Sequence, residues 1–254
     1  MGVNLFMHSV RLVLGDWRNA LRITGLLYLI YAVPALLLGM AFPPPSQQGG
    51  AESIGSMLAL APGGIIVGLL ALVMVVWIAV AWHRYILLDE VPTGQVPAFN
   101  QDRMLAYAGY SILLGLILLV VSVVVSIVLS PLVFLGAAAF GTILSIVVIA
   151  VALIVDFRLG LVLPAKALGK PLTFGEAWQA TKGETGTILV LAIVAALAAV
   201  IIDIPAMILA VLPGIGNILS LIWTLGTGWV KAVVGVSLLT TLYGYYIEKR
   251  NIPA

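Results

Sequence analysis

The stretch Asp156–Gly183, DFRLGLVLPAKALGKPLTFGEAWQATKG, decides the fold because it concentrates charge in a chain that is otherwise almost entirely apolar. Apolar runs of about 20 residues lie on both sides of it, and runs of that length can cross a hydrocarbon layer roughly 30 Å thick. The stretch is therefore interpreted as a connector between two membrane spans. Within it, Asp156 and Arg158 are interpreted as bracketing the membrane boundary.

Composition supports the same interpretation. The chain has 254 residues, of which 63% are hydrophobic and 9% are charged, whereas roughly a quarter of the residues in a soluble domain are charged. The apolar runs are continuous and do not alternate with polar residues, which favours helices over a transmembrane barrel. We expect an all-α, polytopic transmembrane helix bundle that forms a single integral membrane domain over residues 1–254.

Working outward from the connector, the pattern predicts six spans. They cover approximately residues 21–42, 62–82, 105–129, 135–155, 186–202 and 218–243, with a Pro- and Gly-rich outer loop at 43–50 and charged connectors at 83–104 and 156–185. A basic, amphipathic lead-in precedes each odd-numbered span, so the chain resembles three repeated helical hairpins with interfacial lead-in helices. Chance similarity among apolar helices is the alternative explanation of the repeat.

Lysine and arginine predict the orientation. The basic residues of the lead-ins, the connectors and the last turn fall on one side, and the three opposite loops contain none. By the positive-inside rule both termini are expected in the cytoplasm, and the protein is expected in a bacterial inner membrane. The net charge of only +2 does not indicate a nucleic-acid partner.

Few chemical functions fit the residue inventory. The chain has no cysteine and two histidines at the ends of different segments, which excludes thiolate sites and makes a metal site unexpected. No GxSxG, HExxH or GxxxxGK[ST] pattern occurs. We therefore expect no catalytic residues, no metal and no cofactor, and the chain is not expected to be an enzyme.

Two charges lie deep inside predicted spans. Lys231 stands about 22 Å of helix from the cytoplasmic boundary and Asp203 about 26 Å, on consecutive antiparallel spans. Because an unpaired charge at that depth is costly, the sequence predicts an Asp203–Lys231 ion pair in the outer half of the bundle. The pair either serves a gate or a charged substrate, or fixes helix register; a lysine that extends outward along its stem is the third possibility.

Small residues at helical spacing predict helix packing. Ser122, Ser126 and Ser130 are spaced by four along the third span, and Gly64 and Gly68 form a GxxxG pattern in the second. Small residues let membrane helices approach closely. A serine-lined pore is the functional alternative.

The connector also offers candidate contacts with membrane lipids or with a protein partner. Residues 173–183 are expected to form an interfacial helix, with Trp178 inward and Lys182 at the head groups. The candidate interface residues are Arg158, Lys166, Lys170, Trp178 and Lys182.

Several of these positions follow a family pattern: Arg158 closing a span, Pro164, the turn Gly169–Pro171, the helix start Glu176–Trp178, and Gly183 before the next span. In this the chain resembles the membrane domain of bacterial glycerophosphoryl diester phosphodiesterases, free-standing and without the catalytic barrel. The resemblance implies six spans and a role in anchoring, scaffolding or partner binding. It implies no catalytic residue.

The sequence thus predicts a non-enzymatic membrane protein acting as a scaffold or accessory subunit, with Phe157–Gly183 as its contact surface. The alternative is a small transporter or lipid-handling permease that uses the charged pair in the membrane. An intramembrane enzyme lacks a nucleophile and base in the sequence.

Overall fold

The computed structural model describes residues 1–41, 52–92, 94, 96–133 and 138–251. Within those ranges the chain forms helices and turns and no strand, which confirms the predicted all-α bundle. Residue 42, the predicted loop 43–50 and the first residues of the predicted span 135–155, residues 135–137, lie outside the described residues.

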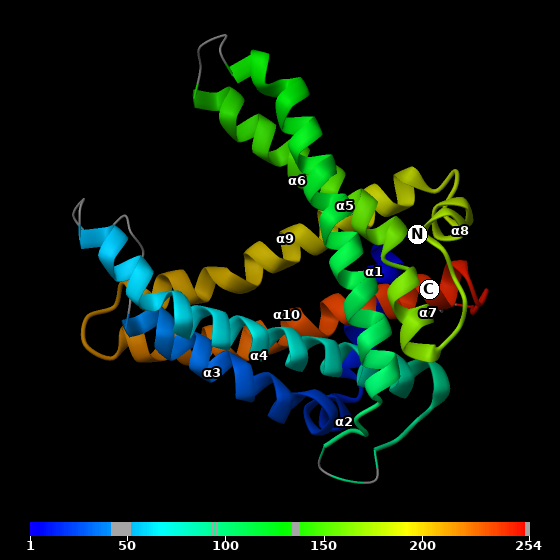
Figure 1. Cartoon of the computed structure of the whole chain (residues 1–254), viewed down its shortest axis with the longest axis horizontal. Helices are drawn as coiled ribbons and strands as arrows, with labels where there is room; N and C mark the ends of the chain where they lie inside the picture. Colours follow the sequence, from blue (N-terminus) through cyan, green and yellow to red (C-terminus); the bar gives the residue numbers. More distant parts are fainter. Residues whose placement is uncertain (42–51, 93, 95, 134–137, 252–254) are drawn as a thin grey trace.

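The helices follow one another in the order of Figure 1. They are α1 (Gly2–Leu14), α2 (Trp17–Ala20), the π-helical turn η1 (Leu21–Gly25), α3 (Leu26–Ala41), α4 (Glu52–Leu88), α5 (Gln101–Val133), α6 (Ala138–Leu159), α7 (Val162–Leu168), α8 (Phe174–Ala180), α9 (Thr185–Ala210) and α10 (Gly216–Tyr246). Six helical segments in the described part of the chain are long and apolar enough to cross a membrane. The chain is therefore compatible with an integral, multi-pass membrane protein.

Several helices run further than the predicted spans. α4 continues to Leu88, because Leu87 on its last turn is buried in the core and this packing stabilises the extra turn. α9 continues through Pro205 to Ala210. A proline disturbs the carbonyls one turn before it, and here the Trp223 indole of α10 donates a hydrogen bond to the Ile202 carbonyl at 2.9 Å. This hydrogen bond ties α10 to α9 in the turn before the proline.

The connector between α6 and α9 is itself folded. α7 ends at Gly169, whose φ of 74° is the left-handed conformation that glycine adopts without strain. α8 starts with a capping box, in which the Thr173 side chain accepts from the Glu176 backbone and the Glu176 carboxylate accepts from the Thr173 backbone. The backbone N–H of Thr173 lowers the pKa of the Glu176 carboxyl. These local signals fix two short helices where the sequence predicted one.

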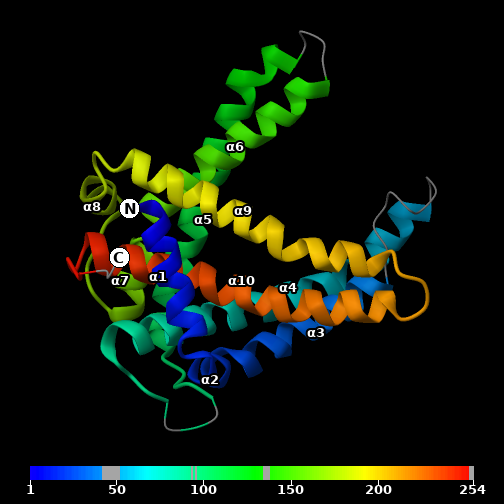
Figure 2. The same ribbon diagram turned by 180° about the vertical axis from the view of Figure 1, so that it is seen from behind.

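The long helices form three hairpins, α3–α4, α5–α6 and α9–α10 (Figure 1). α1 lies across α9 and α10, as the reverse view shows (Figure 2). A Cβ placed on Gly2 would lie 2.5 Å from the Thr187 carbonyl oxygen, so the close approach of α1 to α9 requires a glycine. The hairpin arrangement agrees with the predicted layout, and the internal sequence repeat stays a prediction.

The core lies where α1, α7, α8 and the last turns of α4 and α10 gather, here called the basal end (Figure 1). From there the α5–α6 hairpin runs in a different direction from the other two hairpins (Figures 1 and 2). The basal end is thus densely packed, whereas the far halves of the hairpins separate.

Polar side chains inside the basal end pair with one another. The Trp82 indole donates to the Ser237 hydroxyl at 2.7 Å, and the Ser9 hydroxyl donates to that of Thr241 at 2.9 Å. The imidazole of His83 lies 2.8 Å from the Thr240 hydroxyl. Trp82, His83, Ser9 and Ser237 have no exposed surface, so these pairs join α1, α4 and α10 inside the core.

Candidate functional site

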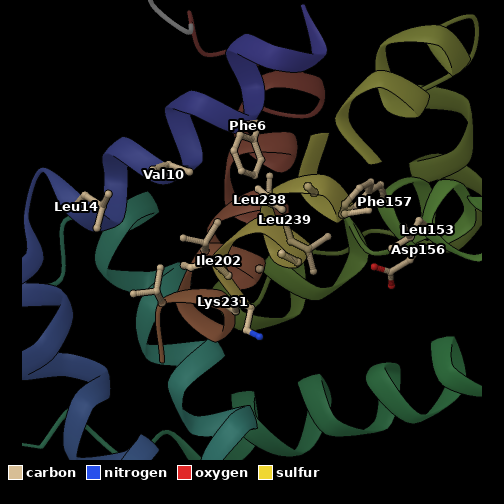
Figure 3. A pocket seen from close by; sticks show the side chains of 17 residues that line it. Phe6, Val10, Leu14, Leu153, Asp156, Phe157, Ile202, Lys231, Leu238 and Leu239 are labelled. Atoms are coloured by element: carbon tan, nitrogen blue, oxygen red, sulfur yellow. The ribbon is translucent and has the colours of Figure 1, made fainter. Parts of the chain in front are cut away.

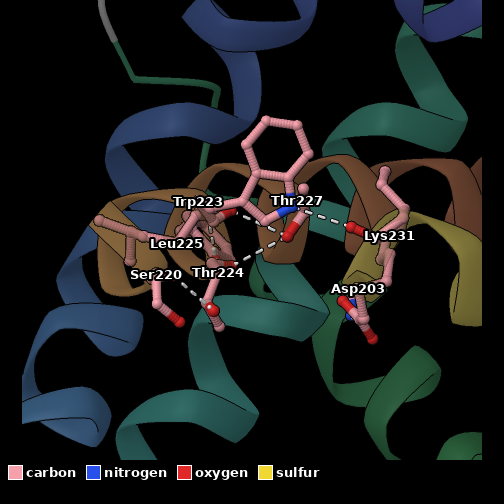
Figure 4. Close-up of polar contacts among 9 residues, drawn as sticks. Asp203, Ser220, Trp223, Thr224, Leu225, Thr227 and Lys231 are labelled. Atoms are coloured by element: carbon pink, nitrogen blue, oxygen red, sulfur yellow. Dashed lines mark hydrogen bonds and ion pairs between the residues drawn. The ribbon is translucent and has the colours of Figure 1, made fainter. Parts of the chain in front are cut away.

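The structure brings Asp203 of α9 and Lys231 of α10 together (Figure 4). The Lys231 Nζ lies 2.6 Å from Oδ1 and 2.8 Å from Oδ2 of Asp203. Both oxygens of the carboxylate therefore accept from the ammonium, which is held toward α9 and does not extend along the helix surface. The two charges neutralise each other at this level of the hairpin.

The ion pair is not sealed inside the bundle. The Lys231 side chain is 36% exposed and the Asp203 side chain 44% exposed. The neighbouring hydroxyls of α10 bond to their own helix. Thr224 donates to the Ser220 carbonyl and Thr227 donates to the Trp223 carbonyl (Figure 4). Among these polar side chains, those of the ion pair are both charged and partly exposed.

A cavity of about 650 Å³ lies beside the pair, between α1, α6, α9 and α10 (Figure 3). Its wall is mostly apolar, with Phe6 and Val10 from α1 and Leu238 from α10. Ala195 and Ala199 on α9 keep the space open because their side chains are short. The described residues thus line an open apolar site of the size at which proteins bind small ligands, roughly 300–1,000 Å³.

Two charged side chains lie in the cavity wall, Lys231 of α10 and Asp156 of α6 (Figure 3). Asp203 neutralises Lys231 and does not itself line the cavity. The Asp156 carboxylate accepts no hydrogen bond and forms no ion pair with any residue that the structure describes. Arg158, two residues later, is turned to another neighbour.

Asp156 is the functional candidate that the sequence did not single out. A carboxylate at the end of an apolar run indicates the membrane boundary, and nothing in the sequence places α1 and α10 near it. The structure shows that α6 continues to Leu159, so Asp156 belongs to the helix and not to the connector, and the sequence carries no signal of this.

The predicted interface residues do not form one exposed patch. The Arg158 guanidinium lies 4.5 Å from the centre of the Trp178 ring and donates to the Thr185 hydroxyl at 2.6 Å. Arg158 is only 6% exposed, so its assignment as an exposed contact residue is corrected: α8 and the start of α9 cover it. Trp178 faces inward over Arg158 although its outer surface is exposed.

The three lysines of the connector differ from one another. The Lys166 ammonium lies 4.3 Å from the centre of the Tyr110 ring, and Lys170 pairs with Glu248 at 2.8 Å. The Glu248 partner raises the pKa of Lys170. Lys182 is exposed. Lys166 and Lys170 thus hold the connector to α5 and to the residues after α10. The predicted lipid or partner contact stays a prediction for Lys166, Lys170, Lys182 and the exposed face of Trp178.

Among the residues that the structure describes, the glycine pattern of α4 makes no helix contact of the predicted kind. A Cβ placed on Gly64 or Gly68 would meet no atom within 4 Å. A Cβ placed on Gly63 would lie 3.8 Å from Cδ1 of Leu38, so α3 faces the side of α4 that carries Gly63. Ser122 and Ser126 lie on the half-buried face of α5, and the Ser130 hydroxyl donates to the Ile127 carbonyl at 2.8 Å. A packing role for these serines stays a prediction.

One further polar cluster joins the start of α2 to the last turns of α4. The Tyr85 hydroxyl donates to the Asp16 carboxylate, and the Asn19 amide donates to the same group at 3.0 Å. The hydrogen bond from Tyr85 lowers the pKa of the Asp16 carboxyl. This cluster ties the lead-in helix to α4.

No group of three or more histidine, aspartate or glutamate side chains that could hold a metal ion occurs among the described residues. Comparisons of the chain with protein-family models, with curated proteins and with solved structures gave no match. The resemblance to the membrane domain of glycerophosphoryl diester phosphodiesterases therefore stays a prediction based on the connector residues alone.

Proposed function

We propose that the protein is a non-enzymatic, lipid-handling membrane protein that takes a lipid-like amphiphile into the cavity between α1, α6, α9 and α10. The observation that carries the proposal is the Asp203–Lys231 pair, which is more than a third exposed beside an apolar cavity. A charged pair exposed to hydrocarbon is costly. A site that receives polar head groups or water removes that cost.

The shape of the site suits an amphiphile. Its wall is apolar along α1 and α9, and its charges come from Asp156 and Lys231 alone among the described residues. A ligand with an apolar chain and a polar head matches such a wall better than a sugar or a nucleotide, which would leave many hydroxyls without partners. The cavity lies between apolar helices, so a lipid can enter it sideways from the bilayer.

A scaffold or accessory role is the second candidate, and the α5–α6 hairpin favours it. This hairpin stands apart from the other two (Figure 1), and Leu119, Val123 and Ile127 of α5 are about half exposed or more. Within a bilayer such a surface contacts lipid or the helices of a partner. We propose a bacterial inner membrane and cytoplasmic termini for either role, on the basic residues of the connectors.

The first experiment is native mass spectrometry of the protein released from lipid particles. A selectively retained lipid or other small amphiphile, with no protein companion, supports the lipid-handling proposal. A stoichiometric protein companion and no retained amphiphile favours the accessory role and contradicts the first.

A second experiment uses the absence of cysteine. A single cysteine placed at Val234 or Gly235, both in the cavity wall, is the only thiol in the chain. We expect it to react with a small, charged, membrane-impermeant thiol reagent, and bound amphiphile to slow the reaction. The matched control is Val128→Cys, since Val128 is 67% exposed on α5 and faces lipid in this proposal. Equal reactivity at the control and cavity positions would contradict a polar entry to the site.

A further inference from the structure

The cavity holds an unbalanced charge. Of the two charged residues in its wall, Lys231 is neutralised by both carboxylate oxygens of Asp203. Asp156 has no partner in the ranges that the structure describes. Counting Asp203 with Lys231, the site carries one negative charge more than it can neutralise.

Arg158 does not supply the missing positive charge. Two residues along an α-helix turn the side chain by about 200°, so Asp156 and Arg158 project from nearly opposite faces of α6. The Arg158 guanidinium is held by Thr185 and by the Trp178 ring, and Arg158 does not line the cavity. The geometry therefore separates the two charges that the sequence places next to each other.

We infer that the cavity recognises an amphiphile with a cationic head group, an amine or a quaternary ammonium, and that Asp156 is the residue that binds this group. The inference rests on the proposed function and specifies its ligand. A carboxylate in apolar surroundings attracts a cation more strongly than it does in water, because the local dielectric constant is lower.

The position of Asp156 sets the orientation of the ligand. Asp156 lies in the last turns of α6, near the basal end, whereas Lys231 lies further along α10 (Figure 3). Phe157, which follows Asp156 in the chain, lines the cavity near the head-group position, and Phe6, Ala195, Ala199 and Leu238 line the path of the apolar chain. An aromatic ring near a carboxylate is compatible with an ammonium ion, which the face of the ring attracts.

The test compares lipids that share their acyl chains and differ in head group. Lipid particles are prepared with equal amounts of a dioleoyl lipid bearing trimethylammonium, of dioleoylphosphatidylglycerol and of dioleoylglycerol, and the lipid retained by the protein is measured by native mass spectrometry. We expect the cationic lipid to be retained roughly tenfold over the other two, as one charge-assisted contact implies.

Asp156→Asn is expected to abolish this preference while the total amount of retained lipid stays the same. Asp156→Glu is expected to keep it, and Asp102→Asn is the matched control because Asp102 is exposed at the start of α5 and outside the cavity. A preference that persists in Asp156→Asn overturns the inference.

The wild-type protein alone tests the inference if Asp156→Asn does not fold. Retention of all three lipids without preference overturns the inference and leaves the proposed function intact. Retention of none overturns both. Displacement of the cationic lipid by free choline at an equal concentration would show that the ligand is a water-soluble amine, which also overturns the inference.

Discussion

The polar side chains of the basal end and those beside the cavity differ in charge and in burial. At the basal end, Trp82, Ser237, Ser9 and Thr241 are neutral, hydrogen-bonded and almost completely buried. Beside the cavity, Asp203 and Lys231 are charged and partly exposed. Neutral pairs can be buried at little cost once they are hydrogen-bonded, whereas burying charges is costly even when they are paired. The first arrangement fixes the structure, and the second leaves charge accessible to a ligand.

The largest expected effect comes from breaking the basal end. Trp82→Ala removes a completely buried side chain and leaves the Ser237 hydroxyl without its donor. Truncation of a buried tryptophan costs about 3–5 kcal/mol. Denaturant unfolding in mixed micelles measures the loss, with Trp17→Ala as the control because Trp17 is 51% exposed. If both variants unfold at the same denaturant concentration, the packing described for the basal end is wrong.

The next effect comes from the charged pair. Lys231→Met and Asp203→Asn each leave one charge alone in an apolar span, at a cost of at least about 2.5–3.5 kcal/mol on insertion scales. Each single variant is expected to accumulate poorly in the membrane, and the double variant to recover. Quantitative immunoblots of the membrane fraction measure this, with Lys182→Met as the exposed control. A double variant as poor as the singles would show that the two charges do not depend on each other.

A pH-dependent effect is expected at Asp16, outside the spans. The hydrogen bond from Tyr85 lowers the pKa of Asp16 below its ordinary value of 3.8, so the bond contributes stability above that value and loses it as the pH falls through the lowered pKa. Tyr85→Phe is expected to cost about 1 kcal/mol at neutral pH. The difference from wild type should shrink once Asp16 is protonated. A difference that stays constant down to acidic pH would exclude Asp16 as its source.

The smallest effect is expected at the open glycines. Gly68→Ala places a Cβ where no atom of the described residues lies within 4 Å, and alanine favours a helix over glycine by up to about 1 kcal/mol. The variant should be as stable as wild type or slightly more stable. Gly2→Ala should be less stable, because its Cβ would meet the Thr187 carbonyl. Thermal unfolding distinguishes the two. If Gly68→Ala lowers the stability, this face of α4 packs against a partner.

The lengths of the helices, several of their ends and the depth of the charged pair could be predicted from the sequence, because each depends on residues close together in the chain. Continuous apolar runs predict long helices, and the rise of 1.5 Å per residue places Asp203 and Lys231 at similar depth. Turn residues such as Gly169 and the capping pair Thr173–Glu176 mark helix ends wherever they occur. Each of these inferences needs only one helix or two consecutive ones.

The remainder depends on which helix faces lie together. Gly64 and Gly68 have the spacing of a packing motif, yet the nearest helix packs elsewhere on α4. Arg158 ends a span as an exposed residue would, yet Trp178 and Thr185 cover it. Asp156 becomes a candidate site residue because it lines one cavity with α1, α9 and α10, which come from distant parts of the chain. Apolar periodicity is almost uniform around these helices, so it does not specify their rotation.

The Asp203–Lys231 pair also bears on how the chain is made. The two residues lie on consecutive helices that only residues 211–215 connect. If α9 and α10 leave the translocation machinery together, the charges meet before either helix contacts lipid alone, and the hairpin enters the bilayer as a neutral unit. A helix that waited for its partner would carry the full cost of its charge. The short turn between α9 and α10 thus favours insertion of the two helices as one unit over insertion one after the other.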